Sequence, residues 1–319
     1  MILLLPQSNP ETPLWHEFCE LCPCSQKKRT RKLDGNGAKP DIAGGPRVPR
    51  PGILAIFHAK LVASPNDQHL PFRAGFTCVL TLYSWPKLYG VADNNGYGLK
   101  VFAFLRLTGV AFQHEHVFDA SSAPRGQLPY IVDDGETIGD SDAIIAHLIR
   151  KYRLTIDDGL TRIERDTDHL IKRMLDDLYW VISYSRWKDE RFWPAFRDAL
   201  MREHPALTAE GLRKAREYNF QRYQFQGIGR YEPEAAYARG LVDLLVLANL
   251  LPARDYLHGD KPRSIDAAIY GFIANIHFYD IETPLKAFVA AHVNLVRHCN
   301  AIHAAVTASP RKVDNSRLQ

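Results

Sequence analysis

The stretch Gly126-Gln-Leu-Pro-Tyr-Ile-Val-Asp-Asp-Gly135 decides the fold class of this chain. Its apolar run from Leu128 to Val132 predicts a buried strand. Asp133-Asp-Gly135 is typical of a hairpin turn, so Glu136-Thr-Ile138 is expected to form the next strand. Asp140-Ser141 follows, and both residue types are strong helix N-caps. The stretch therefore predicts two strands joined by a tight turn and followed at once by a helix.

Upstream of this stretch the chain alternates between strand and helix patterns. Thr77-Cys-Val-Leu-Thr-Leu-Tyr83 is a short run rich in β-forming residues. Leu99 to Leu107 predicts a helix, and Phe112 to Phe118 alternates apolar and polar side chains as a strand does. The predicted order is strand, helix, strand, strand, strand, helix. That order is most of a thioredoxin-like α/β unit, with the helix between the second and third strands missing or degenerate.

Downstream of Leu160 the strand patterns nearly vanish and apolar residues recur at helical spacing. This spacing runs through three segments, at positions 170–178, 241–248 and 269–276. The sequence therefore predicts an all-helical second domain. We expect the thioredoxin-like domain at residues 76–153, the helical domain at 160–308 and a polar tail at 309–319.

Composition separates the first 75 residues from the rest of the chain. Of 319 residues, 46% are apolar and 24% charged, which is typical of a globular protein. Residues 1–75 hold ten of the 40 Lys and Arg, six of the 36 acidic residues and ten of the 20 prolines. They therefore carry the whole net charge of +4, and we expect a basic, proline-rich extension that is largely disordered.

Charge and hydropathy argue against nucleic acid and membrane as partners. A net charge of +4 is too small to indicate a nucleic-acid partner. The longest apolar stretches, such as Leu244 to Leu251, fall short of the roughly 18 residues that span a bilayer, so no transmembrane segment is expected. The apolar start Met1-Ile-Leu-Leu-Leu5 lacks the basic residues and the cleavage site of a signal peptide.

The cysteines and histidines indicate a reducing compartment and no metal centre. Cys19, Cys22 and Cys24 could offer thiolates to zinc, or they form an incidental cluster, because no His or Cys pair follows at finger spacing. Cys78 and Cys299 fit no disulfide framework. The thirteen histidines show no metal-ligand pattern. We therefore expect a cytoplasmic protein without a bound metal.

The motifs above, together with others in the second half, resemble those of the glutathione-transferase superfamily. The further motifs are Tyr179-Trp-x-x-x-Tyr-Ser-Arg-Trp187, Gln226-Gly-Ile-Gly-Arg230 and Gly259-Asp-Lys-Pro262 leading to Asp266-Ala-Ala-Ile-Tyr-Gly271. The resemblance covers nearly all of residues 76–319 and is strongest to the branch that contains the failed-axon-connections proteins, the metaxins and their bacterial relatives. It implies a thioredoxin-like α/β N-terminal domain plus an all-α C-terminal domain, the glutathione-transferase architecture.

The resemblance also implies a glutathione site on the first domain. In such folds the bond between Leu128 and Pro129 is cis, which turns the Leu128 backbone outward to pair with glutathione; a trans proline at the start of an edge strand is the alternative. Asp140 and Ser141 are then expected to hold the γ-glutamyl carboxylate at a helix N-terminus, or only to cap that helix.

A transferase must hold the glutathione thiol as a thiolate, so its free pKa of about 8.5 has to be lowered by a helix N-terminus or a donor. In the resembled branch the first helix opens with Ser-Pro-Phe-Cys-Leu-Lys, and the matching stretch here is Asn95-Gly-Tyr-Gly-Leu-Lys100. Asn95 and Gly98 thus stand where the branch has a hydroxyl and a thiol. The candidate catalytic residues are therefore Asn95, Tyr97 and, at the end of the first strand, Tyr83.

A second-substrate pocket is predicted beside the thiol. Trp85 follows the first strand, and Tyr184 and Arg186 belong to a dense aromatic and basic set in the helical domain. Within this set, Trp180, Tyr184 and Trp187 lie three or four positions apart and share a helix face. Such a face walls an apolar pocket or belongs to the core. Trp85, Tyr184 and Arg186 are the candidate pocket residues.

The leading hypothesis is a soluble glutathione-transferase-like protein that binds glutathione and conjugates it to a small apolar electrophile. The alternative is a non-catalytic interaction protein on the same fold, as the metaxin-like relatives imply. A homodimer is compatible with both hypotheses.

Overall fold

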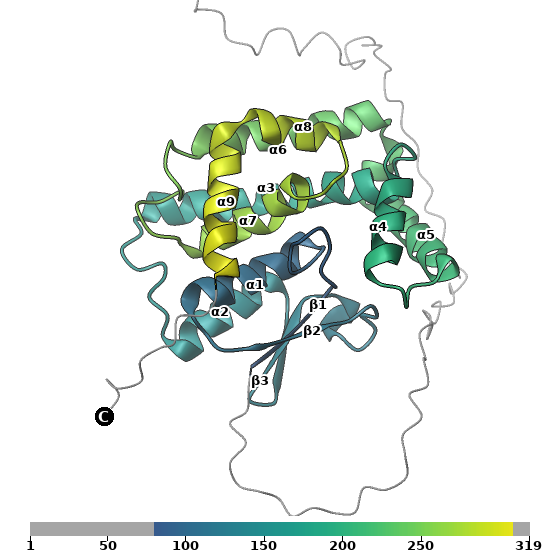
Figure 1. Cartoon of the computed structure of the whole chain (residues 1–319). Coiled ribbons are helices and arrows are strands. Elements are labelled where there is room, and N and C mark those ends of the chain that lie inside the picture. The colour runs from purple at the N-terminus through teal and green to yellow at the C-terminus, as the bar shows by residue number, and fades with distance from the viewer. Residues whose placement is uncertain (1–79, 309–319) are drawn as a thin grey trace, which may run out of the picture. The chain divides into compact units, whose positions relative to one another are not determined.

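The computed structural model describes residues 80–308, which are coloured in Figure 1. The predicted extension at 1–75, its cysteine cluster and the tail at 309–319 lie outside the described residues. Within them, a mixed four-stranded sheet with its helices is followed by a run of helices alone. The predicted fold class, a thioredoxin-like α/β domain followed by an all-α domain, is confirmed.

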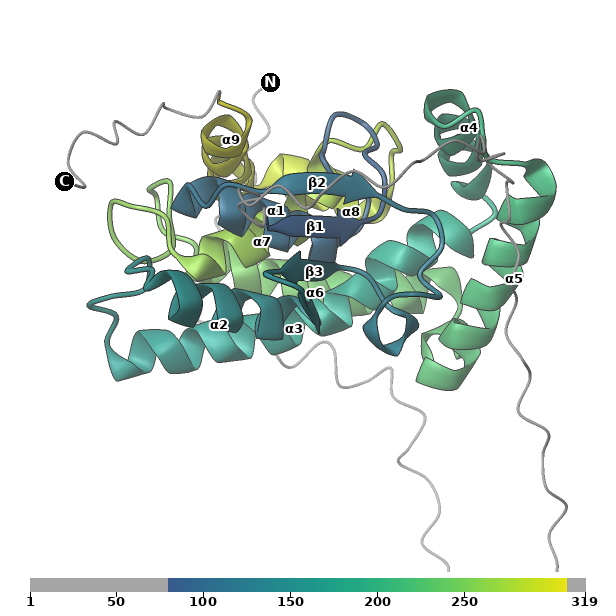
Figure 2. The same ribbon diagram turned by 90° about the horizontal axis from the view of Figure 1, so that it is seen from below.

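The sheet is built from short strands in the order β2-β1-β3-β4. They are β1 (Thr81–Ser84), β2 (Gln113–His116), β3 (Tyr130–Asp133) and β4 (Glu136–Gly139). β1 is parallel to β2 and antiparallel to β3, which is antiparallel to β4. Figure 2 shows β2, β1 and β3 side by side. The predicted hairpin turn joins β3 to β4 at Asp134 and Gly135, both of which have positive φ.

Two helices complete the first domain as the structure describes it. α1 (Gly96–Thr108) joins β1 to β2, and α2 (Ser141–Tyr152) follows β4 directly. Only a 3-10 turn, η1 (Pro124–Gly126), lies between β2 and β3. The predicted loss of a helix at this point is therefore confirmed.

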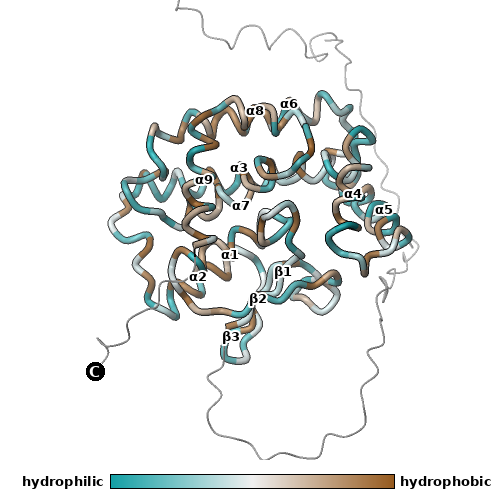
Figure 3. The backbone as a smooth tube through the Cα atoms, viewed as in Figure 1, coloured by the Kyte–Doolittle hydropathy of each residue, from teal (hydrophilic) through white to brown (hydrophobic). Residues whose placement is uncertain are grey.

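The second domain is helical over its described length. Its elements are α3 (Arg162–Trp187), α4 (Trp193–Glu203), α5 (Ala209–Gln226), η2 (Ile228–Arg230), α6 (Pro233–Leu250), α7 (Ser264–His277), α8 (Pro284–Ala291) and α9 (Val293–Thr307). Brown hydrophobic positions alternate with teal polar ones along most of these helices in Figure 3. α7 differs, because every residue from Ile265 to Ile276 is buried. Among residues 80–308, no helix combines the length and the hydropathy needed to cross a membrane.

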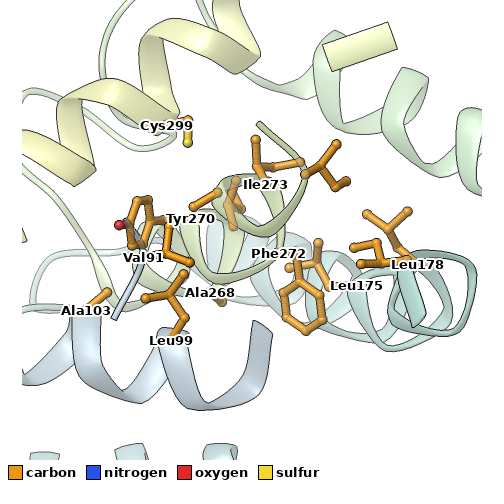
Figure 4. Packing of buried hydrophobic residues seen from close by; sticks show 14 of the residues in the cluster. Val91, Leu99, Ala103, Leu175, Leu178, Ala268, Tyr270, Phe272, Ile273 and Cys299 are labelled. Atoms are coloured by element: carbon orange, nitrogen blue, oxygen red, sulfur yellow. The ribbon is translucent and has the colours of Figure 1, made fainter. Parts of the chain in front are cut away.

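α7 crosses α1 at very short range. A Cβ atom at Gly271 of α7 would lie 2.4 Å from the carbonyl oxygen of Gly96, so only glycine permits this approach. In Figure 4, Leu99 points from α1 toward α7. The crossing fixes the start of α1 against the helical domain.

Candidate functional site

The strand register brings the predicted glutathione-binding residues to one end of the sheet. Tyr83 of β1 is paired with Tyr130 of β3, which in turn is paired with Gly139 of β4. One residue further out, Pro129 precedes β3 and Asp140 follows β4. The end of β1, the proline and the start of α2 therefore lie side by side, as a common binding site requires.

The Leu128–Pro129 peptide bond is cis, so the trans alternative is wrong. The Leu128 side chain is buried, and its backbone N–H and C=O make no hydrogen bond within residues 80–308. An extended ligand backbone can therefore pair with Leu128 in the manner of an added strand.

The start of α2 uses Asp140 as its cap and buries Ser141. Asp140 Oδ1 accepts hydrogen bonds from two N–H groups of the first turn at 3.0 and 3.1 Å, and Oδ2 accepts one from Arg125 at 3.1 Å. Ser141 is buried, and its Oγ accepts a hydrogen bond from Lys100 Nζ at 3.2 Å. Capping therefore occupies the Asp140 carboxylate, whereas Ser141 is held against a cation.

Lys100 is a buried cation that the site prediction missed. It is only 4% exposed on α1, and its ammonium group donates to both Ser141 and Asp142. Burial lowers the pKa of Lys100, although the Asp142 carboxylate opposes that shift. For Asp142, burial acts to raise the pKa, but the neighbouring cations Lys100, Lys172 and Arg173 lower it overall. The available sequence signal is a lone charge inside the apolar run from 99 to 105.

Asn95 lies at the N-terminus of α1, where the sequence places the thiol. It is the N-cap of this helix, and its Oδ1 accepts a hydrogen bond from the Tyr97 N–H at 3.0 Å. Its Nδ2 makes no hydrogen bond within the described part of the chain. Asn95 can therefore offer one neutral amide donor to a ligand.

The two candidate tyrosines have different surroundings. The Tyr97 hydroxyl donates to Asp176 Oδ1 of α3 at 3.0 Å, and its ring packs against Tyr179 and Phe272. Burial, followed by the negative charge of Asp176, raises the pKa of Tyr97. Tyr83 stacks on Tyr130 across the β1–β3 pair, with ring centroids 4.6 Å apart. The Tyr97 hydroxyl is thus already engaged in joining the two domains.

The three predicted pocket residues have different surroundings. Trp85 is half-buried, and its carbonyl oxygen contacts His116 Nδ1 at 3.0 Å. Tyr184 is buried in the helical core. Arg186 is buried too, where its Nη1 donates to the Asn94 carbonyl at 3.0 Å. Arg186 therefore holds the loop that leads into α1 by a hydrogen bond to its backbone.

A hollow of about 130 Å³ lies elsewhere, between α3, η2 and α6. Trp180, Ile228 and Tyr231 line it together with Asp177 and Asp243. None of the predicted glutathione residues borders this hollow. Within residues 80–308, no three His, Cys, Asp or Glu side chains are grouped so that they could hold a metal ion.

Comparison with known families identifies both domains. The glutathione S-transferase N-terminal domain model matches residues 97–192, and the glutathione S-transferase C-terminal domain model matches residues 241–302. A glutathione transferase from Phanerochaete chrysosporium has the same fold, with a TM-score of 0.51 and 16% identity over 71% of this chain and 97% of that structure.

Curated relatives match most of the chain. Isoprene-epoxide–glutathione S-transferase from Rhodococcus sp. (strain AD45) is 29% identical over 233 residues, which are 70% of this chain and 98% of that protein. Failed axon connections from Drosophila melanogaster is 28% identical over 268 residues, 77% of this chain but only 62% of that protein. Metaxin-1 from Sus scrofa is 24% identical over 70% of this chain and 74% of its own length.

The two matched domains, their order and the mixed sheet with its cis-proline define one class. The chain carries an N-terminal and a C-terminal glutathione S-transferase domain, and its relatives include Failed axon connections and metaxin-1, as the sequence motifs indicated. It is a glutathione-transferase-like protein.

Proposed function

We propose that this chain binds glutathione at the end of the sheet and conjugates it to a small apolar electrophile. The observation that carries the proposal is the contact between the buried Lys100 ammonium and Ser141 at the N-terminus of α2. The γ-glutamyl carboxylate is attracted there by the ammonium group, by the hydroxyl and by the helix dipole. The cysteinyl backbone of glutathione pairs with Leu128 beside the cis-proline.

This pose directs the glutathione sulfur toward the N-terminus of α1. There the thiol gives its proton to solvent, and the thiolate forms a bond to an electrophilic carbon as that carbon loses its leaving group. With an epoxide, the ring C–O bond breaks and the oxygen takes a proton from water. An epoxide is the substrate class we favour, because the Rhodococcus relative is named for isoprene epoxide.

Slow turnover is expected at this site. The donor that Asn95 can offer is a neutral amide, and the Tyr97 hydroxyl is bonded to Asp176. Each hydrogen bond to the thiolate contributes about 1.5–3 kcal/mol, so a site with one such donor holds the thiolate less firmly than a site with two. The same observations favour the second candidate function, a glutathione-binding interaction protein that does not catalyse conjugation.

Two further properties stay predictions. Cytoplasmic location rests on the cysteine pattern, which indicates a reducing compartment. A homodimer rests on the resemblance alone, and sedimentation of the purified chain would measure it.

Titration calorimetry with glutathione tests the binding site. Lys100→Met should lower the affinity for glutathione about tenfold to hundredfold, because one charge-assisted contact to the γ-glutamyl carboxylate is lost. Lys100→Arg should retain most of the affinity. Lys151→Met is the matched control, since Lys151 lies at the other end of α2 and pairs with Asp133 and Asp134.

The dipeptide cysteinylglycine sharpens the test, because it lacks the γ-glutamyl group. The unaltered protein should prefer glutathione over this dipeptide, and Lys100→Met should remove most of that preference. Equal affinity for both ligands in the unaltered protein would contradict the proposed pose. Turnover of isoprene epoxide, measured as thiol consumption, then separates the two candidate functions.

A further inference from the structure

The loop before α1 buries a carboxyl group with one unpartnered oxygen. Asp93 is fully buried, with an exposed fraction of 0%. Its Oδ1 accepts a hydrogen bond from the Asn95 N–H at 2.6 Å. Its Oδ2 has no hydrogen-bond partner among residues 80–308. A carboxylate in such a place is costly, so the site favours the neutral acid.

This carboxyl group occupies the space of a missing side chain. A Cβ atom at Gly98 would lie 1.7 Å from Asp93 Oδ2 and 3.2 Å from Ser84 Cβ. Gly98 belongs to the first turn of α1, at the position where the resembled branch has cysteine. The Asp93 carboxyl is thus aimed into the helix N-terminus that faces the glutathione sulfur under the proposed function.

Neutral groups face Asp93 from the sheet. The Ser84 hydroxyl of β1 lies beside it and contacts His114 Nε2 of β2 at 2.8 Å. Burial, followed by repulsion from His116, lowers the pKa of His114 to about 4, so His114 is neutral at physiological pH. His116 lies against His114, with ring centroids 4.2 Å apart, and burial lowers its pKa as well.

On the side of the helical domain, the polar contacts go to the backbone of the loop. The Asn275 amide of α7 donates to the Asp93 carbonyl at 3.3 Å, and Arg186 of α3 donates to the Asn94 carbonyl. The Tyr279 hydroxyl donates to the same Asn94 carbonyl at 3.2 Å. No cation therefore bonds to the Asp93 carboxyl itself in the described part of the chain.

Burial raises the pKa of Asp93 to about 8, although the neighbouring Ser84 hydroxyl and the N–H groups of Asn95 and Trp85 act to lower it. Below about pH 8 the group is an uncharged acid that still orders the Asn95 loop. Above it, a negative charge lies at the helix N-terminus that would stabilise the thiolate, and like charges repel.

We propose that Asp93 is the positioning residue of the thiol site, and that the site accepts a thiolate only while this carboxyl is neutral. The inference rests on the proposed binding of glutathione. Gly98 has no side chain where the resembled branch has one, and the Asp93 carboxyl group from the preceding loop takes its place. The alkaline limit of thiolate binding is then set within the protein and not by the ligand.

The test compares two ligands at about pH 6 and about pH 9 by calorimetry. Glutathione can present a thiolate, whereas S-methylglutathione cannot. The unaltered protein should lose about tenfold or more of its affinity for glutathione between these pH values relative to S-methylglutathione. Asp93→Asn keeps the neutral shape and an acceptor for Asn95, so it should remove this difference. Asp134→Asn, at an exposed turn, is the matched control.

Each result has a defined meaning. If neither ligand binds at about pH 6, the proposed function fails. If both bind but Asp93→Asn keeps the alkaline loss, this inference alone fails. If Asp93→Asn changes the affinity for S-methylglutathione as much as the affinity for glutathione, Asp93 has only a structural role.

A measurement on the unaltered protein covers the case in which Asp93→Asn does not fold. The titration of the Asp93 carboxyl can be followed by carbon NMR. Bound glutathione should raise its pKa and bound S-methylglutathione should not, because coupling between two charges is reciprocal. An equal effect of both ligands would overturn the proposal.

Discussion

Asp266 serves three partners at the start of α7. It is fully buried, and its Oδ2 accepts a hydrogen bond from the Arg263 N–H at 2.7 Å. Its Oδ1 accepts one from the Leu257 N–H at 2.9 Å and contacts His298 Nε2 at 2.9 Å. One carboxyl group thus ties together the loop before α7, the helix start and α9.

Asp266→Ala should therefore lower the free energy of unfolding by about 2–4 kcal/mol, because three hydrogen-bonding groups, two of them buried, lose their partner. Urea unfolding followed by circular dichroism measures the loss. Asp260→Ala changes an exposed residue of the same loop and should stay within about 0.5 kcal/mol of the unaltered protein. A loss below about 1 kcal/mol at Asp266 would contradict this role.

Single residues also mark the limit of sequence reasoning at the site. Asp140 and Ser141 could be found because a cap sits next to its helix in sequence. Lys100 meets Ser141 across 41 positions of the chain, so its contact depends on how α1 packs against α2. Asp93 could not be found either, because its carboxyl group fills the space that the absent side chain of Gly98 leaves, and no spacing rule describes such a contact.

Among the elements, the α1–α7 crossing shows why periodicity predicts helices better than their contacts. The spacing at 269–276 predicted α7, but not that the helix is buried on all sides. Where two adjacent residues are both apolar, periodicity also does not tell which of them faces the core. In α3, Ile171 is buried while Leu170 is 68% exposed. The missing helix between β2 and β3 could be predicted because the sequence between these strands has no apolar residues at helical spacing.

Gly271→Ala should destabilise the protein by about 1–3 kcal/mol, since the added methyl group must push α7 away from the Gly96 carbonyl. Gly211→Ala in the first turn of α5 is the control, and it should leave stability unchanged or raise it by up to about 1 kcal/mol. Thermal unfolding of the two variants checks both signs. Equal stability of Gly271→Ala and the unaltered protein would mean that the crossing relaxes freely.

At the scale of the whole described molecule, Arg186 links the two domains. Its guanidinium group is buried, bonds to Asn94 and Asn275 and lies over the Tyr279 ring at 3.8 Å. Burial lowers the pKa of Arg186, because no carboxylate neutralises its charge among the described contacts. The sequence predicted Arg186 as a pocket residue but could not predict its contacts, because its partners come from a loop and a helix about 90 positions away on either side.

Arg186→Met should remove this link and leave the Asn94 carbonyl with one donor fewer, at a cost of about 2–4 kcal/mol. Arg186→Lys should recover only part of the loss, because lysine lacks the planar fork that reaches both partners. Hydrogen exchange should rise at residues 93–97 in both variants. Arg162→Met, on a side chain that is 94% exposed in α3, should change neither quantity.

The hydrogen bonds from Arg186 and Asn275 to the loop at 93–94 limit how segments of this protein can be exchanged with those of a relative. The loop at 93–94 belongs to the first domain by sequence, but residues of α3 and α7 hold its shape. A recombination event with a breakpoint between α2 and α3 would transplant the loop without the residues that hold it. Chimaeras should therefore exchange the loop, α3 and α7 as one heritable unit.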